Sequence, residues 1–378
     1  DLTDTVELRT PGASDTDIPT QAIPSGYFTF EGVLNDRFGT YRPFPIDSTD
    51  ITPRLVLTIL HNNDAESQLI DAGSGAEDFG GAARFKAVVD MLKEDARFLD
   101  GSPVVTLSSG DNFLAGPEFS ASLDRNPSLP YYDAVVVDSI GYDALAIGNH
   151  EFDFGPEVLA NFIEDVSATM PPFLSANLDF SGEPSLAALE GSGRIAKRVV
   201  IQRGPEQIGV VGATTTLLAS ISSPGGVSVS QAVADSVQAQ VDALTAQGVE
   251  NIILISHLQS IEEDSALVSQ LRDVDIVIAG GGDELLANPD DLLLPGDAPS
   301  GPYPRTAPDA NGETVFLVTT AGSYKYVGRL VVHFEEGEVA AINDLSGPVR
   351  VSTVAPDAVM PDSALQVGVI DSIEAYVA

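Results

Sequence analysis

Short apolar segments recur along the chain from Leu55 onward, and polar segments separate them. Each apolar run is rich in Val, Ile and Leu and is bounded by Gly, Pro, Asn or Asp, which is typical of buried strands. The runs predict strands over residues 55–60, 103–108, 143–147, 173–176, 197–202, 207–212, 251–255, 275–279, 314–319 and 326–334.

The segments between these strands have the periodicity of amphipathic helices. Within 84–99 the apolar residues recur at three- and four-residue steps and would share one buried face: Phe85, Val88, Val89, Leu92, Ala96 and Leu99. Helices are predicted over 82–98, 130–140, 156–165, 230–247, 262–272 and 363–377. Because strands alternate with helices, the pattern predicts an α/β layered fold rather than a sandwich or a bundle.

Two segments fall outside this alternation. Residues 1–50 are rich in Asp, Thr, Pro and Gly without a helical period, and we expect an extended N-terminal arm or a small β element. Residues 286–313 contain several prolines and predict a long excursion close to the strand ends.

The composition restricts the partners and the compartment. Asp and Glu number 56 against 18 Lys and Arg, so the formal charge is -38, which argues against nucleic acid or an anionic membrane as a partner. Such a charge suits a salty, cation-rich medium. No cysteine is present for disulfides or thiolate ligands, and no apolar stretch is long enough to insert into a membrane. The chain begins at Asp1 without a signal-like segment, so we expect a processed protein or part of a longer one.

Polar residues collect where the predicted strands end. Five such segments carry potential metal ligands: HNNDAES at 61–67, SGDNFLAG at 109–116, GNHEFDFG at 148–155, SHLQSIEED at 256–264 and GGGDELL at 280–286. They contain three of the four histidines, His61, His150 and His257. In layered α/β folds, sites form beyond the carboxyl ends of the strands. The five segments together therefore favour a metal site.

Each of these residues also has a structural interpretation when it is taken alone. Asp64 and Glu66 could form an acidic turn on an acidic protein, and Asp111 could cap its own turn. Asn149 could cap a following helix, and His257 could be a buried histidine that donates to a carbonyl. His61 is expected to serve the core or to support the ligands.

At the level of motifs, the chain resembles the calcineurin-like metallophosphoesterases, in particular the secreted bacterial 5′-nucleotidases. The matching segments run in the family's order over about residues 55–345: LTILHNND, GGAARFKAVVDML, SSGDNFLAG, ALAIGNHEFDFG, FLSANL, ILISHL and TTAGSYKYVGRLVVHF. GNHEFDFG is the most specific of them. The resemblance implies a four-layer α/β-β/α sandwich of two mixed sheets, with metals between the strand ends.

The resemblance also implies a domain organisation. Residues 51–360 would form the metallophosphoesterase domain, and 361–378 would be the helix that leads into a C-terminal domain not present in this chain. In the family that domain stacks the base of the substrate, so nucleotide specificity is inherited here by analogy only.

Carried over residue by residue, the resemblance implies a centre of two divalent cations. Asp111 would bridge the two ions, Asp64 would bind the first, and Asn149 and His257 would bind the second. His150 would be the catalytic histidine, oriented by Asp153. The implied reaction is in-line attack of a metal-held hydroxide on a phosphoester, with His150 stabilising charge or protonating the leaving oxygen.

The sequence departs from the family where three imidazoles are expected. Glu66 occupies the first of these positions, Gly281 the second and Asp283 the third, and Glu284 is close enough to substitute if the turn shifts. A first site of Asp64, Glu66, Asp111 and Asp283 would offer oxygen ligands only. Such a set favours Ca²⁺, Mg²⁺ or Mn²⁺ over Zn²⁺, and we expect an atypical, calcium-bearing centre. Water or Glu284 would complete the second site.

Three hypotheses about function follow. The first is a secreted phosphoesterase, extracellular, periplasmic or on a bacterial surface, that acts on a small phosphorylated substrate such as a nucleotide. The alternative is a catalytically weak, calcium-stabilised module of a larger cell-surface or filament protein, with further domains or a surface assembly as partners. The third is a phosphodiesterase or another ester-cleaving relative. The pair His150 and Asp153 favours the enzyme, because a structural calcium site does not need it.

Overall fold

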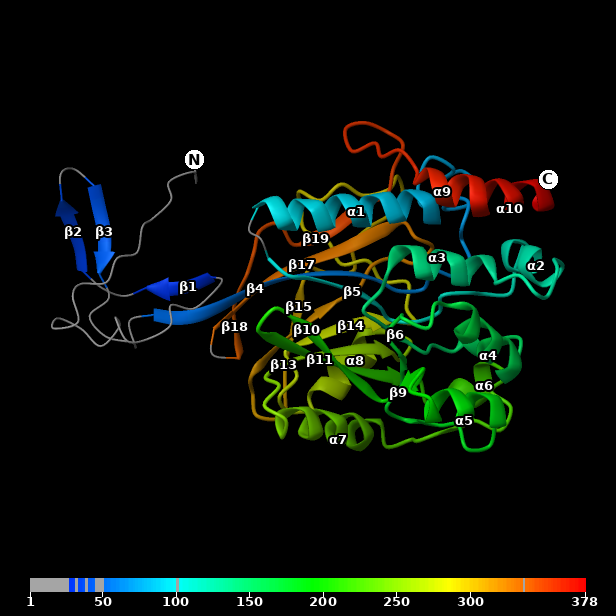
Figure 1. Cartoon of the computed structure of the whole chain (residues 1–378), viewed down its shortest axis with the longest axis horizontal. Helices are drawn as coiled ribbons and strands as arrows, with labels where there is room; N and C mark the ends of the chain where they lie inside the picture. Colours follow the sequence, from blue (N-terminus) through cyan, green and yellow to red (C-terminus); the bar gives the residue numbers. More distant parts are fainter. Residues whose placement is uncertain (1–26, 31–32, 38–39, 45–50, 100–101, 336) are drawn as a thin grey trace.

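The structure is a computed structural model that describes residues 27–30, 33–37, 40–44, 51–99, 102–335 and 337–378. Its main body has four layers, in which two β-sheets pack face to face and helices cover the outer face of each (Figure 1). The predicted α/β-β/α sandwich of two mixed sheets is therefore confirmed.

The first sheet is built around β4, whose carboxyl end carries the opening ligand segment. Its strands lie in the order β18 (Glu338–Ile342), β17 (Tyr326–Glu335), β4 (Ile51–Asn62), β5 (Val104–Ser108), β6 (Ala144–Ala146), β7 (Phe173–Leu174) and β9 (Ile195–Ala196). In addition, β1 (Tyr27–Phe30) pairs with β4, and β19 (Gly347–Arg350) pairs with β17. The strands from β4 to β9 are parallel to one another, whereas β17 runs antiparallel to β4.

The second sheet has the order β10 (Arg198–Arg203), β11 (Glu206–Thr214), β13 (Asn251–His257), β14 (Ile276–Gly280), β16 (Thr314–Val318) and β15 (Arg305–Pro308). The four inner strands are parallel, and antiparallel strands close both edges. Two further pairs stand apart from both sheets: β2 (Val33–Arg37) with β3 (Thr40–Phe44), and β8 (Leu178–Asp179) with β12 (Ser228–Val229).

Helices cover both sheets on their outer faces (Figure 1). The first sheet is covered by α1 (Ala82–Leu99), α2 (Pro117–Leu123), α3 (Tyr132–Ile140), α4 (Pro156–Asp165), α5 (Pro184–Gly191) and the C-terminal run of α9 (Ser363–Leu365), a π turn (Gln366–Ile370) and α10 (Asp371–Val377). The second is covered by α7 (Val233–Thr245) and α8 (Ile261–Val268). Short helical turns lie at His150–Phe152 and in α6 (Leu218–Ile221). No helix within the described residues has the length and apolarity needed to cross a bilayer.

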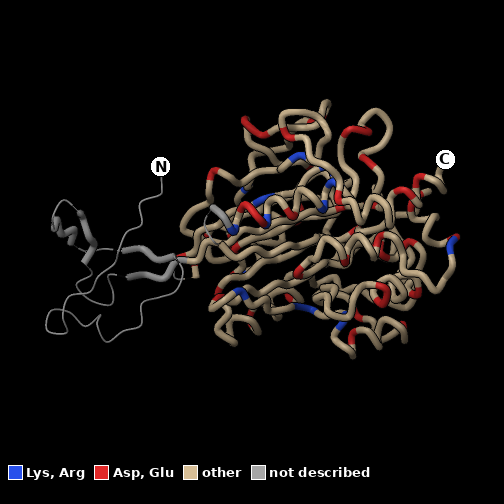
Figure 2. The backbone as a smooth tube through the Cα atoms, turned by 45° about the horizontal axis from the view of Figure 1, so that its top comes forward, with Lys and Arg blue, Asp and Glu red and all other residues tan. Residues whose placement is uncertain are grey.

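Apolar side chains fill the space between the sheets and the space under the first helical layer. One core joins inward residues of β4 and β5 to those of β11, β13 and β14, and a second joins β4 and β6 to α1, α3 and α4. A few acidic residues are nevertheless buried, among them Asp111, Asp133, Glu151 and Asp264. Figure 2 shows the acidic residues spread along the chain with few basic ones among them. The outward distribution of charge is what a large apolar core permits.

The two sheets make backbone contact at Gly212, where β11 meets the end of β7. The carbonyl of Gly212 accepts from the backbone N–H of Ala176 at 2.8 Å. A Cβ atom at position 212 would lie 2.4 Å from the carbonyl oxygen of Leu174, so only glycine fits. This contact aligns the carboxyl ends of both sheets along one edge of the body.

We predict that Gly212→Ala destabilises the protein by about 2 kcal/mol or more, because the added methyl group collides with backbone rather than with a flexible side chain. Urea denaturation measures the effect. The matched control is Gly191→Ala at the end of α5, where nothing lies within 4 Å of the added Cβ. Equal stability of the two variants would contradict the close approach of the sheets.

Candidate metal centre

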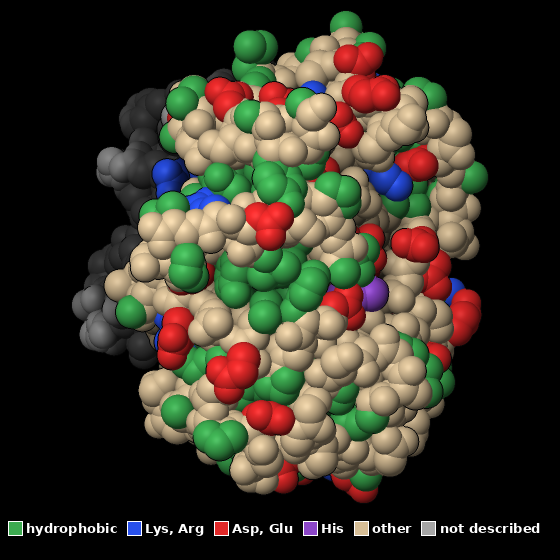
Figure 3. Space-filling view, turned by 90° about the vertical axis from the view of Figure 1, so that its right-hand side faces the viewer, with side chains coloured by type: hydrophobic (Ala, Val, Ile, Leu, Met, Phe, Trp, Pro, Cys, Tyr) green, Lys and Arg blue, Asp and Glu red, His purple; other side chains and the backbone are tan. Residues whose placement is uncertain are grey.

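The predicted ligand segments meet where the strands of both sheets have their carboxyl ends; we call this end of the body the common edge. In the first sheet β4 and β5 end together at Asn62 and Ser108. In the second sheet β13 and β14 end together at His257 and Gly280. Figure 3 looks onto this edge, which lies at the right of Figure 1; a histidine is exposed there beside acidic side chains, next to a group of hydrophobic ones.

Asp64 and Asp111 lie in two loops that are bound to each other. The backbone N–H of Asp64 donates to the carbonyl of Gly110 at 3.1 Å, and that of Glu66 donates to the carbonyl of Asp111 at 2.9 Å. Asp64, Glu66 and Asp111 all have left-handed backbones, with φ of 51°, 54° and 53°. Such conformations in three non-glycine residues are uncommon, and strain of this kind collects at functional sites. The loops hold two buried carboxylates close together.

The Asp64 carboxylate is fixed from two sides. Asn63 Nδ2 donates to Asp64 Oδ2 at 2.6 Å, and the backbone N–H of Gly281 donates to Asp64 Oδ1 at 3.0 Å. Burial raises the pKa of Asp64 to about 7, and the negative charge of Asp111 adds to that increase. Its charged form therefore needs a positive partner inside the protein.

His257 joins the two carboxylates from β13. Its Nδ1 contacts the carbonyl of Ser109 at 2.7 Å, so Nδ1 carries a proton and Nε2 faces the cluster. Nε2 lies 2.9 Å from Asp111 Oδ2, 3.9 Å from Asp64 Oδ1 and 3.2 Å from Asn149 Oδ1. Although burial lowers the pKa of His257, the charges of Asp111 and Asp64 outweigh it and raise the value to about 10. A protonated Nε2 therefore pairs with both carboxylates.

His150 lies on the open side of the same cluster. Its backbone N–H donates to Asp111 Oδ1 at 2.8 Å, and its ring Nε2 lies 4.0 Å from Asp111 Oδ2. Its Nδ1 contacts Asp153 Oδ2 at 2.7 Å, and Asp153 Oδ1 accepts from Ser222 Oγ at 3.0 Å. Burial lowers the pKa of His150, but the hydrogen bond to Asp153 and the charge of Asp111 raise it to about 9. The side chain is 29% exposed and can reach a bound molecule.

The predicted residues form two groups that share one carboxylate. Asp64, Asp111 and His257 have ligand atoms within 4.8 Å of one another, and so do Glu66, Asp111 and His150. Glu66 is half-buried, and burial raises the pKa of its carboxyl, with a further increase from the charge of Asp111. A carboxylate shared by two ligand groups is the arrangement that a bridging ligand requires.

Asp283 and Glu284 belong to neither group among the described residues. Asp283 is exposed. The carboxylate of Glu284 accepts from the backbone N–H of Ile261 at 3.3 Å, at the start of α8, and therefore faces that helix. Of the glycine run, Gly281 contributes its backbone N–H to Asp64. His61 lies in the core, where Nε2 contacts the hydroxyl of Tyr303 at 2.7 Å.

Glu151 is a site residue that the sequence interpretation missed. Its fully buried carboxylate accepts from the backbone N–H groups of Asp111, Asn112 and Gly148 at 3.0, 2.7 and 2.7 Å, and from Asn112 Nδ2 at 3.0 Å. It binds the loop after β5 to the loop after β6 and so fixes Asp111 relative to His150. Burial raises the pKa of Glu151 to about 7, and the charge of Asp111 adds to this. The only sign of this role in the sequence was the position of Glu151 next to His150 in GNHEFD.

The donor set fits divalent cations. The buried carboxylates of Asp64 and Asp111 have oxygen atoms within 4.8 Å of a ring nitrogen of His257. A divalent cation could bind these three groups in place of the proton on His257. Carboxylate oxygens, an amide oxygen and imidazole nitrogens are all ligands of divalent cations in proteins.

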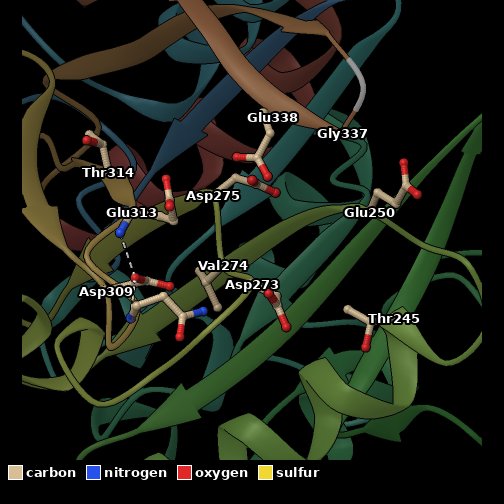
Figure 4. Close-up of a pocket in the computed structure, with 11 residues that line it drawn as sticks. Thr245, Glu250, Asp273, Val274, Asp275, Asp309, Glu313, Thr314, Gly337 and Glu338 are labelled. Atoms are coloured by element: carbon tan, nitrogen blue, oxygen red, sulfur yellow. Dashed lines mark hydrogen bonds between the residues drawn. The ribbon is translucent and has the colours of Figure 1, made fainter.

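A second acidic cluster lies at the opposite edge of the second sheet (Figure 4). It lines a cavity of about 250 Å³ with Glu250, Asp273, Asp275, Asp309, Glu313 and Glu338. Asp309 accepts from the backbone N–H groups of Asn311 and Glu313, and Asp275 accepts from that of Ile252. These bonds are typical of turns and strand starts, and none of the described lining residues is a histidine. The cluster therefore carries no catalytic assignment.

No protein-family model matches the chain. The chain is 32% identical over 293 residues to a 5′-nucleotidase of Diplobatis ommata, covering 75% of this chain and 47% of that protein. A 5′-nucleotidase precursor from Thermus thermophilus has a TM-score of 0.70 and 30% identity, covering 85% of this chain and 58% of that one.

A calcineurin-like phosphoesterase from Bacillus subtilis, YfkN, has a TM-score of 0.62 and 18% identity, covering 86% of this chain and 100% of that one; this likeness concerns the fold. The chain spans about half the length of the curated relatives that it matches.

We predict that Glu151→Gln lowers the free energy of unfolding by about 2 kcal/mol at pH 8, because the amide nitrogen would face N–H donors that now bind oxygen. Denaturation with chelator present measures it. The control is Glu157→Gln on α4, whose partly exposed carboxylate accepts from Ser185 Oγ and should change stability by less than about 0.5 kcal/mol. An unchanged Glu151→Gln would show that the two loops do not depend on this carboxylate.

The raised pKa of the Asp275 carboxyl predicts that the stability of the protein depends on pH. Burial raises its pKa to about 8, and the charges of Glu338 and Asp273 increase it further, against the hydrogen bond from Ile252. Because the folded state holds the proton more tightly than the unfolded state, this stabilisation is complete below about pH 4 and is lost as the pH rises through 8. We expect Asp275→Asn to reduce the loss of unfolding free energy between pH 5 and pH 9 by about 2 kcal/mol or more.

Urea titrations at both pH values, with chelator present, test this. Asp290→Asn serves as the control because Asp290 is exposed. If Asp275→Asn and the native protein lost the same stability between the two pH values, the carboxyl of Asp275 would be ionised throughout.

Proposed function

Because the chain belongs to the calcineurin-like metallophosphoesterases of the 5′-nucleotidase type, we propose that it hydrolyses phosphate monoesters, with 5′-nucleotides as substrates, at a centre of two divalent cations. The observation that carries this proposal is the sharing of Asp111 between two ligand groups, beside a hydrogen-bonded His150 and Asp153. The relatives that are named 5′-nucleotidase support the choice of substrate.

The residues at the common edge would form two ligand sets, one for each cation. Asp111 would hold the first together with Asp64 and Glu66, each of which has a ligand atom within 4.8 Å of one on Asp111 although the two belong to different groups. Asp283 lies within electrostatic range of Glu66. Asp111, Asn149 and His257 would hold the second, from three different strand ends. When bound, such cations lower the pKa of a water molecule and polarise the phosphoryl oxygens.

His150 supplies the proton that the leaving oxygen needs. The Asp153 carboxylate accepts from Nδ1 and orients the ring, so Nε2 carries the second proton toward the open side. Ser222 holds the other oxygen of Asp153 in place. The hydrogen bond to Asp153, which lies outside both ligand groups, favours a protonated ring, so His150 would act as a general acid.

The same donor set suggests the cations. Oxygen ligands dominate the first group, so we propose Ca²⁺, Mg²⁺ or Mn²⁺, with Zn²⁺ disfavoured. The strongly negative charge is compatible with a cation-rich medium, and we propose an extracellular, periplasmic or cell-surface location in a bacterium. The chain covers about half of its relatives, so further domains or a surface assembly remain part of this proposal.

We predict that His150→Ala lowers kcat for a chromogenic phosphate monoester by about 10² to 10⁴-fold while Mn²⁺ binding is kept, because the variant loses the general acid. Ser222→Ala should lower kcat several-fold with little change in KM, since Asp153 loses a partner but His150 remains. Ser220→Ala is the control: its exposed hydroxyl donates to the carbonyl of Leu217, away from Asp153.

The assay is run with Ca²⁺, Mn²⁺, Zn²⁺ or a chelator, on AMP and on a diester. If no cation supported turnover and a chelator lowered the melting temperature, the protein would be a calcium-stabilised structural module and not an enzyme. Faster hydrolysis of the diester than of the monoester would make the protein a phosphodiesterase.

A further inference from the structure

The side chain of Gln259 lies in the candidate metal centre, although Gln259 belongs to no ligand motif. It follows β13 in the short turn before α8 and is half-buried. Its Nε2 donates to Asn149 Oδ1 at 2.8 Å, and the same oxygen lies 3.2 Å from His257 Nε2. Since His257 Nε2 is 2.9 Å from Asp111 Oδ2, the four side chains form one continuous cluster.

The backbone of Gln259 is held in an unfavourable conformation to reach this position. Its φ is 130°, in the region that favours glycine. The neighbouring chain leaves room for the amide: a Cβ atom at Gly281 would lie 2.9 Å from Gln259 Nε2 and 3.0 Å from His257 Nε2. A side chain at position 281 and the present position of Gln259 therefore exclude each other. Strain of this kind is retained where the position of a group matters.

The amide nitrogen of Gln259 lies 2.8 Å from Asn149 Oδ1, which is slightly closer than two ligands of one cation. Two oxygens bound at a right angle to one ion, each at about 2.1 to 2.4 Å, lie about 3.0 to 3.4 Å apart. Half a turn about the terminal bond exchanges the nitrogen and oxygen of the amide, which places Oε1 where Nε2 now faces Asn149. Without a cation the nitrogen faces Asn149 Oδ1 and donates to it. With a cation on Asn149 and His257, the positive charge favours the oxygen in that place.

We infer that the side-chain amide oxygen of Gln259 is a ligand of the second cation, together with Asp111, Asn149 and His257. This assignment rests on the proposed two-cation centre and goes beyond it by naming the group that completes the weaker site. Glu284, the other candidate, faces the start of α8 through Ile261 and does not belong to the cluster. The ligand set would then be two amide oxygens, one carboxylate and one imidazole.

Binding of Mn²⁺ alone tests the assignment without any measurement of activity. Equilibrium dialysis, with electron paramagnetic resonance to detect free Mn²⁺, gives the stoichiometry and both affinities. We expect the native chain to bind two Mn²⁺ ions, and Gln259→Ala to bind the weaker one at least about tenfold less tightly with the other unchanged. Gln270→Ala is the matched control, because that amide lies on the surface after α8 and donates to the carbonyl of Ala266.

Gln259→Glu separates a ligand from a residue that only orients Asn149. A carboxylate offers an oxygen ligand but no donor, so a ligand role predicts Mn²⁺ affinity equal to or higher than that of the native chain. If Gln259→Glu weakened the second site as much as Gln259→Ala does, the inference would be wrong. Two Mn²⁺ ions with unchanged affinities in Gln259→Ala would also overturn it and leave the proposed centre intact. A native chain that binds no Mn²⁺ would refute both.

Discussion

The buried carboxylate of Asp111 is the constraint on which the rest of the site depends. It lies between loops from both sheets, and burial alone would raise its pKa; the positive charge of His257, with the hydrogen bonds from His257 and His150, lowers it instead. His257 and His150 keep this charge in place against the neighbouring carboxylates, because an unpaired buried carboxylate would take up a proton. The close packing of the sheets at Gly212 brings the two sets of loops near enough for that pairing.

Because buried carboxylates need a positive partner, the centre suits cations rather than an apolar ligand. A proton on His257 Nε2 neutralises part of the charge of Asp64 and Asp111. In the proposed centre a divalent cation would replace that proton, and the imidazole would be a neutral ligand through the same nitrogen. The hydrogen bond from Nδ1 to Ser109 remains in both states and keeps the ring in one orientation.

Much of this arrangement was predictable from the sequence, because strand ends of a layered α/β fold meet at a common edge. The ten predicted strands and the main helices lie where their apolar periodicity indicated, and Asp64, Asp111, Asn149, His150 and His257 are brought together. The short helices α2 and α5 were missed, since each begins with a proline and has too few turns to show a period. Glu151 and Gln259 were missed because their roles depend on backbone N–H groups and on an unusual φ, neither of which has a sequence pattern.

The proposed ligand sets also have a consequence for the balance between the two cation sites. In the proposed first site, Glu66 would add its charge to those of Asp64 and Asp111, and the negative charge would attract a cation. The proposed second site would have amides and one imidazole beside the shared Asp111, so its affinity would depend on geometry more than on charge. The strained turn at Gln259 and the two neighbouring glycines act on that geometry. Occupancy of the second site would therefore respond to small changes in this turn, whereas the first site would stay filled.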